Sequence, residues 1–188
     1  MLACPAHTGM MVWRTMTARL AIRPLTAADA AAYRALRLQA LRDHPEAFGA
    51  SYEDEVARSL EMTAKRLDGG PLNCVFGAFA GDDLVGTAGF IVPDRSAKSR
   101  HKGLLVGVHV APAHRGHGLG RALVTAVIDH ARAHVVLLQA AVGVANASAL
   151  RLYESLGFRH YGREDKALRV DGVFVDEALI VLDFAADA

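Results

Sequence analysis

The chain has 188 residues, of which 52% are hydrophobic and 22% charged, and its 21 Lys and Arg nearly balance its 20 Asp and Glu. This composition is typical of a globular domain with a sizeable core. The net charge of +1 argues against a dedicated nucleic-acid binder, which would be strongly basic, and against an acidic disordered chain. Two cysteines, Cys4 and Cys74, are too few for a disulfide scaffold and favour a reducing cytoplasm.

No apolar run reaches the roughly 18–20 residues that span a bilayer, so no membrane partner is expected. The N-terminus has no basic segment followed by an apolar one, which argues against a secretory signal. We expect residues 1–17 to be a disordered extension or a mis-assigned start, and residues 18–188 to form one domain.

The first third of this domain reads as a strand followed by helices. A strand is predicted over 19–24, and Thr26 can cap a helix that runs to Leu41, with Asp29 placed as in a capping box. A second helix is predicted from Ser51 to about Leu67. Runs over 73–80 and 84–92 then have β character, and the turn residues between them predict a hairpin.

The remaining elements alternate between strand and helix. Alternation over 104–110 predicts a strand, and the apolar spacing from Leu119 to His130 predicts an amphipathic helix. The apolar run 135–142 is typical of a strand covered on both faces, so these two strands should be parallel. Asn146 can cap a short helix over 147–156, and closing strands are expected over 158–162 and 173–184. The fold class is therefore α/β, with a mixed sheet.

The chemically informative segment is the glycine-rich turn between the 104–110 strand and the following helix. Three glycines, Gly116, Gly118 and Gly120, allow backbone N–H groups to converge on a ligand, and a helix N-terminus adds free donors. Arg115 and Arg121 add cationic donors, so the turn suits a pyrophosphate. The spacing fits neither a P-loop nor a dinucleotide fingerprint.

The turn resembles the acetyl-CoA-binding motif of the GCN5-related N-acetyltransferase (GNAT) superfamily. The family pattern Arg/Gln-x-x-Gly-x-Gly/Ala is matched by Arg115, Gly118 and Gly120. A second segment, from Asn146 to Phe158, is similar to the family's Asn-x-x-Ala-x-x-x-Tyr-x-x-x-Gly-Phe. The resemblance covers about residues 18–186, and two motifs in order make it specific.

The resemblance implies a single GNAT-type domain with about seven strands, flanking helices, and fourth and fifth strands that part at one end. Acetyl-CoA would be the cosubstrate, with pantetheine between those strands. The residues implied to hold it are Val108, Val110, Arg115, Gly116, His117, Gly118, Leu119, Gly120, Arg121, Asn146, Ala149 and Tyr153.

The implied reaction is direct acetyl transfer to a primary amine. The backbone N–H of Val110, near a bulge in the fourth strand, would be the oxyanion donor, and one such donor contributes roughly 3–4 kcal/mol. Tyr153 would protonate or hydrogen-bond the departing thiolate, although a core aromatic on an amphipathic helix is the alternative.

The general base stays open at this level, because the fourth strand has no Glu where many relatives have one. His109 has a suitable intrinsic pKa for a base, but it could equally be a half-buried structural histidine. Glu53, Asp54 and Glu55 could face the acceptor groove and act through water, or they could form a solvated helix start.

The acceptor is a small-molecule or peptide amine that the sequence does not identify; an antibiotic, a polyamine, an amino acid or a protein amine would all fit. A non-catalytic acyl-CoA sensor and a transferase for longer acyl groups are alternatives. No metal is expected, and a homodimer is compatible with the family. Charge is unevenly distributed: residues 95–128 hold six Lys or Arg and no acid, which suits an anionic cofactor, whereas 46–61 hold five acids and one Arg, which could favour a cationic amine.

Overall fold

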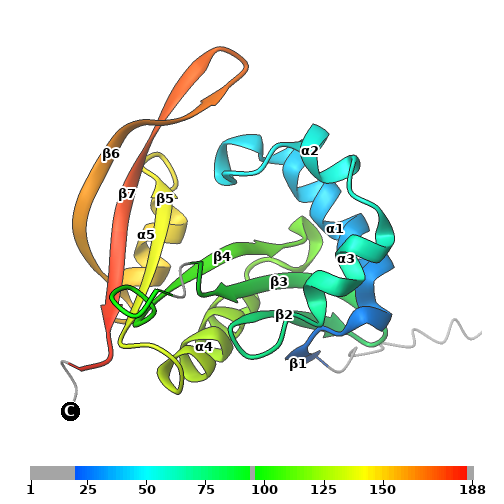
Figure 1. The fold of residues 1–188 in the computed structure, drawn as a ribbon. Coiled ribbons are helices and arrows are strands. Elements are labelled where there is room, and N and C mark those ends of the chain that lie inside the picture. Colours follow the sequence, from blue (N-terminus) through cyan, green and yellow to red (C-terminus); the bar gives the residue numbers. More distant parts are fainter. Residues whose placement is uncertain (1–19, 94–95, 186–188) are drawn as a thin grey trace, which may run out of the picture.

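The computed structural model describes residues 20–93 and 96–185, so the predicted extension 1–17 lies outside the described residues. Seven strands form one mixed sheet in the order β1-β2-β3-β4-β5-β7-β6 (Figure 1). The strands are β1 (Leu20–Pro24), β2 (Asn73–Ala80), β3 (Asp83–Ile91), β4 (Lys102–Val110), β5 (Leu137–Gly143), β6 (Arg159–Val170) and β7 (Val173–Asp183). The helices are α1 (Ala30–Asp43), α2 (Tyr52–Val56), α3 (Leu60–Leu67), α4 (Leu119–Arg132) and α5 (Ala147–Glu154), with 3-10 turns η1 (Ala27–Asp29), η2 (Pro45–Ala47) and η3 (Pro112–His114). The α/β class and the seven-stranded mixed sheet are confirmed.

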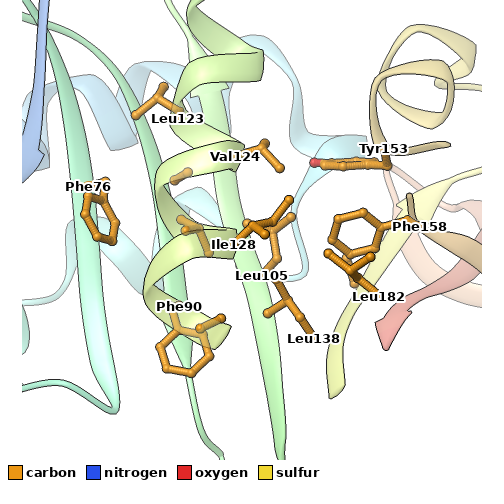
Figure 2. Close-up of a cluster of buried hydrophobic side chains, with 14 of the residues drawn as sticks. Phe76, Phe90, Leu105, Leu123, Val124, Ile128, Leu138, Tyr153, Phe158 and Leu182 are labelled. Carbon is orange, nitrogen blue, oxygen red and sulfur yellow. The ribbon is translucent and has the colours of Figure 1, made fainter. Parts of the chain in front are cut away.

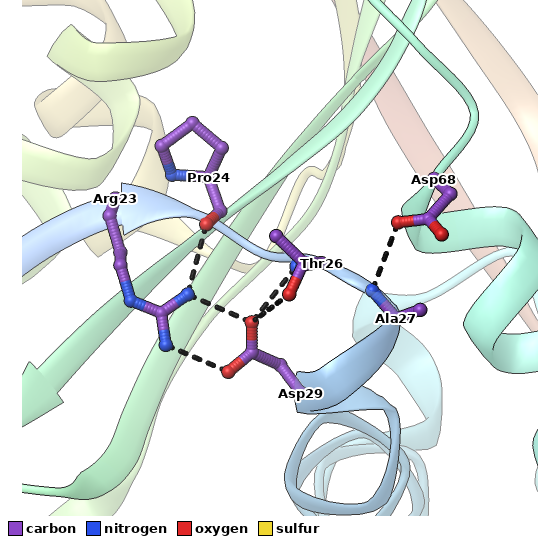
Figure 3. A network of polar contacts seen from close by, with 6 residues as sticks. All are labelled: Arg23, Pro24, Thr26, Ala27, Asp29 and Asp68. Atoms are coloured by element: carbon purple, nitrogen blue, oxygen red, sulfur yellow. Dashed lines mark hydrogen bonds and ion pairs between the residues drawn. The ribbon is translucent and has the colours of Figure 1, made fainter.

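The capping box predicted at Thr26 is present. The Thr26 N–H donates to Oδ2 of Asp29 at 2.9 Å, and Arg23 makes two hydrogen bonds of 2.8 Å to the same carboxylate (Figure 3). These donors hold the pKa of Asp29 well below its usual range, the Arg23 hydrogen bonds contributing most. The element that starts here is a turn of 3-10 helix that passes into α1.

The single helix predicted from Ser51 to Leu67 is wrong, because the segment forms two helices. Ser51 caps α2, and Ser59 accepts a hydrogen bond from the N–H of Met62 at 3.1 Å and so caps α3. A second capping serine in the middle of the segment restarts the helix in a new direction.

Helices cover both faces of the sheet (Figure 1). On one face, α4 and α5 pack over β2 to β5, and Figure 2 shows Val124 and Ile128 of α4 against Leu105 and Leu138. On the other face, α1 and α3 cover β2 and β3. The buried face of α4 is rotated relative to the predicted one, because Ala122 is exposed whereas Val124 and Ile128 are buried. No helix of the described ranges is long and apolar enough to cross a membrane.

The predicted βαβ unit is confirmed, and its two parallel strands stay together only at one end. β4 pairs with β5 from Lys102 to Leu104 and no further, although β4 continues to Val110 and β5 to Gly143. The two ribbons then diverge (Figure 1). The expectation that β5 is covered on both faces is wrong for this reason, and Ala141 is exposed.

A bulge at Gly107 breaks the predicted alternation of β4. Gly107 has φ +61°, and the register with β3 shifts between Thr87 and Gly89. Leu105 and Val108 both pack on the α4 side, whereas a regular strand would place them on opposite faces. The Thr87 hydroxyl donates to the Gly107 carbonyl at 3.2 Å and so satisfies a backbone group that the bulge removes from the ladder.

Candidate active site

A cleft of about 1130 Å³ opens where β4 and β5 part. Its walls are β4, β5, the glycine-rich turn, α5, and the loop after α1. The predicted cofactor-binding residues all line this cleft except His117, which is exposed on the turn, and His109 lines it as well. Segments more than a hundred residues apart in the chain thus contribute to one concave site.

The glycine-rich turn forms one end of the cleft. Gly116 and Gly118 have φ +82° and +76°, a conformation that residues with a Cβ rarely adopt. Gly118 directly precedes α4, whose first N–H groups have no partner within the helix and carry partial positive charge. Arg115 and Arg121 flank this helix start, and Arg121 Nη2 is held by the hydroxyl of Ser155 at 2.6 Å. The free backbone donors and the two cations are chemically suited to an anionic group of pyrophosphate size.

The edge of β4 offers backbone donors to the cleft. The N–H of Ala111 donates to the carbonyl of Val85 in β3 at 2.8 Å. Because successive N–H groups of a strand point to opposite edges, the N–H of Val110 faces away from β3, toward the gap left by β5. The carbonyl of Val110 accepts from Arg115 Nε at 2.9 Å, so its N–H is the group left for a ligand.

The helix α5 brings the second predicted motif to the cleft. Asn146 accepts the N–H of Ala149 at 3.1 Å, which confirms its predicted role as the cap. Tyr153 is buried and packs edge-on against Phe158, with ring centroids 5.6 Å apart (Figure 2). Burial raises the pKa of Tyr153 to about 12. Tyr153 lines the cleft.

His109 lies in the cleft wall but in a poor position for a base. Its residue is 8% exposed, and its Nε2 has no hydrogen-bond partner among residues 20–93 and 96–185. Burial lowers the pKa of His109 to about 4, and the nearby charges of Arg115 and His44 act in the same direction. The imidazole is therefore neutral at pH 7 and only weakly basic.

The predicted acids of α2 do not reach the cleft. Glu53 and Asp54 are exposed, as a solvated helix start requires. Glu55 fits neither expectation: its side chain is buried between Arg37 at 3.9 Å and Arg66 at 4.0 Å. A different carboxylate, Glu177 of β7, lines the cleft, and burial with the nearby Glu164 raises its pKa.

Sequence reasoning missed several side chains that line the cleft, among them Arg37, His44 and Phe48. A signal for Arg37 existed, because it lies four residues after Tyr33 on the stripe of α1 that faces the protein interior. A cation in such a stripe needs a partner or a role. His44 carries no comparable signal in a loop of mixed composition.

Outside the cleft, His130 and His134 stack with ring centroids 4.6 Å apart. Nε2 of His130 lies 2.7 Å from the Pro71 carbonyl, so the pair is held by backbone groups. In the described ranges, no group of three or more His, Cys, Asp or Glu side chains could hold a metal ion.

A mixed sheet whose two central parallel strands part beside a glycine-rich turn is typical of acyl-CoA-dependent transferases with the GNAT fold. Residues 34–158 match the model of the acetyltransferase (GNAT) family, and the chain belongs to this family.

Two curated relatives are similar to parts of the chain. N-alpha-acetyltransferase RimI of Mycobacterium tuberculosis is 38% identical over 102 residues, which are 54% of this chain and 62% of that protein. Mycothiol acetyltransferase of Acidothermus cellulolyticus is 35% identical over 152 residues, 73% of this chain and 43% of that protein. The chain thus spans less than two thirds of the length of each.

A solved structure agrees over most of the chain. The yncA protein of Salmonella typhimurium, solved with its cofactor acetyl-CoA, superposes with a TM-score of 0.74 and 26% identity, covering 88% of this chain and 94% of its own.

Proposed function

We propose that the protein transfers an acetyl group from acetyl-CoA directly to a primary amine. The observation that carries the proposal is the parting of β4 and β5 beyond Leu104, which opens an extended slot between the anion-binding turn and the closed end of the sheet. A long, thin cofactor with a pyrophosphate at one end and a thioester at the other matches a slot of this shape. Relatives named as acetyltransferases, and a similar structure that holds acetyl-CoA, support the choice of cofactor.

The turn from Arg115 to Arg121 would bind the pyrophosphate. The pantetheine would extend along the edge of β4, where the N–H groups of Val108 and Val110 would pair with its amides or with the thioester carbonyl. Gly116, Gly118, Leu119 and Gly120 would contribute backbone donors, and Asn146 and Ala149 would flank the far wall. His117, which is exposed outside the cleft, is left without a role in this arrangement.

The chemistry forms an amide N–C bond and breaks the thioester C–S bond. The amine nitrogen attacks the thioester carbon, the carbonyl oxygen gains negative charge, and the N–H of Val110 stabilises that charge by roughly 3–4 kcal/mol. Collapse of the intermediate expels the CoA thiolate and releases the acetylated amine. Over the whole reaction the nitrogen loses one proton and the thiolate gains one.

Tyr153 would assist the departing thiolate as a hydrogen-bond donor. Its pKa of about 12 keeps the hydroxyl protonated at neutral pH. A thiol has a reference pKa of about 8.5, so complete proton transfer from this tyrosine to the thiolate is uphill. Donation of a hydrogen bond, with the final proton coming from solvent, fits these values better than full protonation by Tyr153.

The proton of the amine would be accepted by Glu177 or by water. The low pKa of His109 makes it a poor base at neutral pH, and the three acids of α2 do not line the cleft. Glu177 lines the cleft. Its raised pKa makes its carboxylate a stronger base, as acceptance of the amine proton requires. The single described cysteine, Cys74, is free, which is consistent with the cytoplasm as the proposed compartment.

The test is release of CoA thiol from acetyl-CoA in the presence of a panel of amines, with calorimetry of CoA binding in parallel. Turnover with at least one amine is expected, together with tight binding of CoA. Binding of CoA without turnover on any amine would replace the proposal by a non-catalytic acyl-CoA sensor. Turnover only with longer acyl-CoA would change the donor, and absence of binding would overturn the cofactor assignment.

A further inference from the structure

The cleft contains, beside the bulge of β4, a buried guanidinium that the proposed cofactor site does not use. Arg37 extends from α1 to the bulge of β4, where a Cβ on Gly107 would lie 3.7 Å from its Nη1. Its guanidinium carbon lies 4.6 Å from the centre of the Phe48 ring, and both residues line the cleft. The Arg37 side chain is 10% exposed, so nine-tenths of this cation is removed from solvent.

The charge of Arg37 is only partly balanced. Glu55 is its one ion-pair partner in the described chain, at 3.9 Å, and the same carboxylate is shared with Arg66 at 4.0 Å. In that part of the chain Arg37 makes no hydrogen bond, and its Nε is a buried donor without an acceptor. Two cations against one anion leave a net positive charge, and Arg66 also lines the cleft.

This imbalance destabilises the folded protein. A buried donor without an acceptor is unfavourable, and more so when the group is charged. Burial lowers the pKa of Arg37, although a guanidinium stays protonated. An anionic group placed against Arg37 would remove this penalty. A planar carboxylate matches the guanidinium, which can donate two parallel hydrogen bonds.

The corner lies beside the expected position of the thioester. Pantetheine would enter from the turn at Arg115 and run back along β4 toward Leu104, where β4 and β5 are still paired. Gly107 lies between Val110 and that closed end, so its neighbour Arg37 would face the acceptor side of the reacting carbon. Phe48, in the loop after α1, lies near the same part of β4, with its ring centroid 6.4 Å from that of His109.

We propose that Arg37 binds a carboxylate of the acceptor, and that the acceptor is a small amine with a carboxylate near its nitrogen, as in an amino acid. This proposal rests on the proposed acetyl transfer and narrows its substrate class. Polyamines lack such a carboxylate, and the N-terminus of a protein has an amide in its place. The other acids of the cleft, Glu46 and Glu177, are then available to the ammonium end of the same molecule.

The experiment compares matched acceptors that differ only in the carboxylate: leucine against isopentylamine, and methionine against 3-(methylthio)propylamine. For the wild-type protein we expect kcat/KM to be at least about tenfold higher for the amino acid of each pair, because an unpaired buried cation penalises the analogue that lacks the anion. Arg37→Met should remove this preference, and the loss should appear mainly in the KM of the amino acid.

A matched control comes from the same helix. Arg42 also lies over an aromatic ring, 4.9 Å from the centre of Tyr52, but it does not line the cleft. Arg42→Met should keep the preference for the carboxylate. Arg37→Lys, which keeps the charge but not the two parallel donors, should keep part of it.

Each outcome bears on one of the two proposals. Equal kcat/KM for both members of each pair in the wild-type protein would overturn the role of Arg37 and leave acetyl transfer intact. An unchanged preference in a folded Arg37→Met protein would overturn it as well. If Arg37→Met fails to fold, the role of Arg37 is tested by the wild-type substrate pairs and by the Arg37→Lys variant, which should show a reduced preference for the carboxylate. No thiol release with any amine would instead contradict the proposed function.

Discussion

Nη2 of Arg115 lies 3.0 Å from Nε2 of His44, seventy-one positions earlier in the chain. An arginine side chain has donors only, so the His44 nitrogen accepts this hydrogen bond. Nε of the same arginine donates to the carbonyl of Val110. One side chain thus connects the glycine-rich turn, the end of β4 and the loop after α1, which are three walls of the cleft.

Arg115→Ala should raise the KM for acetyl-CoA by about tenfold or more, because a pyrophosphate would lose a cationic donor. The measurements are thiol-release kinetics and calorimetry of CoA. His44→Ala removes the connection but leaves the guanidinium, and its effect on KM should be smaller. An unchanged Kd for CoA in Arg115→Ala would remove Arg115 from the cofactor site.

Tyr153→Phe should lower kcat by about 10²-fold while leaving the fold intact, since the ring keeps its packing against Phe158 and only the hydroxyl is lost. Thermal unfolding should show a nearly unchanged Tm. Because burial raises the pKa of Tyr153 to about 12, its hydroxyl stays protonated between pH 6 and 10. The wild-type kcat should therefore show no decrease in that range from ionisation of Tyr153. A variant with wild-type kcat across that range would leave Tyr153 as a core aromatic.

Glu177→Gln should lower kcat/KM and flatten the acidic limb of its pH profile. The raised pKa of Glu177 means that its carboxylate gains a proton at a higher pH than an ordinary Glu, and protonation abolishes its ability to accept the amine proton. His109→Gln is the control, because His109 with a pKa of about 4 is neutral throughout pH 6–9. The pH profile of His109→Gln should keep the wild-type shape. A flat profile for His109→Gln, with an unchanged one for Glu177→Gln, would make His109 the base and exclude Glu177.

His109 should also make stability depend on acid. Its pKa of about 4 in the folded protein lies below the unfolded value of 6.5, so the unfolded chain binds the proton first. The stabilisation from keeping His109 neutral is complete above pH 6.5 and is lost as the pH falls toward 4, by about 3 kcal/mol. Urea unfolding of His109→Gln should show a correspondingly smaller loss between pH 7 and 4. Parallel losses in both proteins would contradict the burial of this imidazole.

Glu55→Gln should destabilise the protein by about 3–5 kcal/mol, because it leaves the cation of Arg37 buried and lowers the charge compensation of Arg66. For a chain of this size that is a fall of roughly 10 °C or more in Tm. Glu53→Gln, two residues earlier on an exposed position of the same helix, should stay within about 0.5 kcal/mol of the wild type. Equal effects of the two substitutions would show that the Glu55 ion pairs contribute nothing.

Most of the fold was predictable because its signals are local. The capping pair of Thr26 and Asp29, the cap at Asn146 and the glycine-rich turn each depend on residues a few positions apart, and each is present. The predicted continuous helix from Ser51 failed at Ser59, where a serine that could sit on a helix surface instead caps a new helix. Sequence alone does not separate these two uses of a serine.

The sequence by itself determined the order of the elements, the family and the residues of the two motifs, because periodicity and motif spacing are properties of neighbouring residues. Only the tertiary structure decided the charge around Arg37, where the acceptor is proposed to bind. The acids of 46–61 suggested a site for a cationic amine, but packing of α1 against α2 and α3 neutralises Glu55 with two arginines and leaves Arg37 in excess at the bulge of β4. Coulomb energy depends on distances through space and on burial, and the spacing of charges along the sequence determines neither.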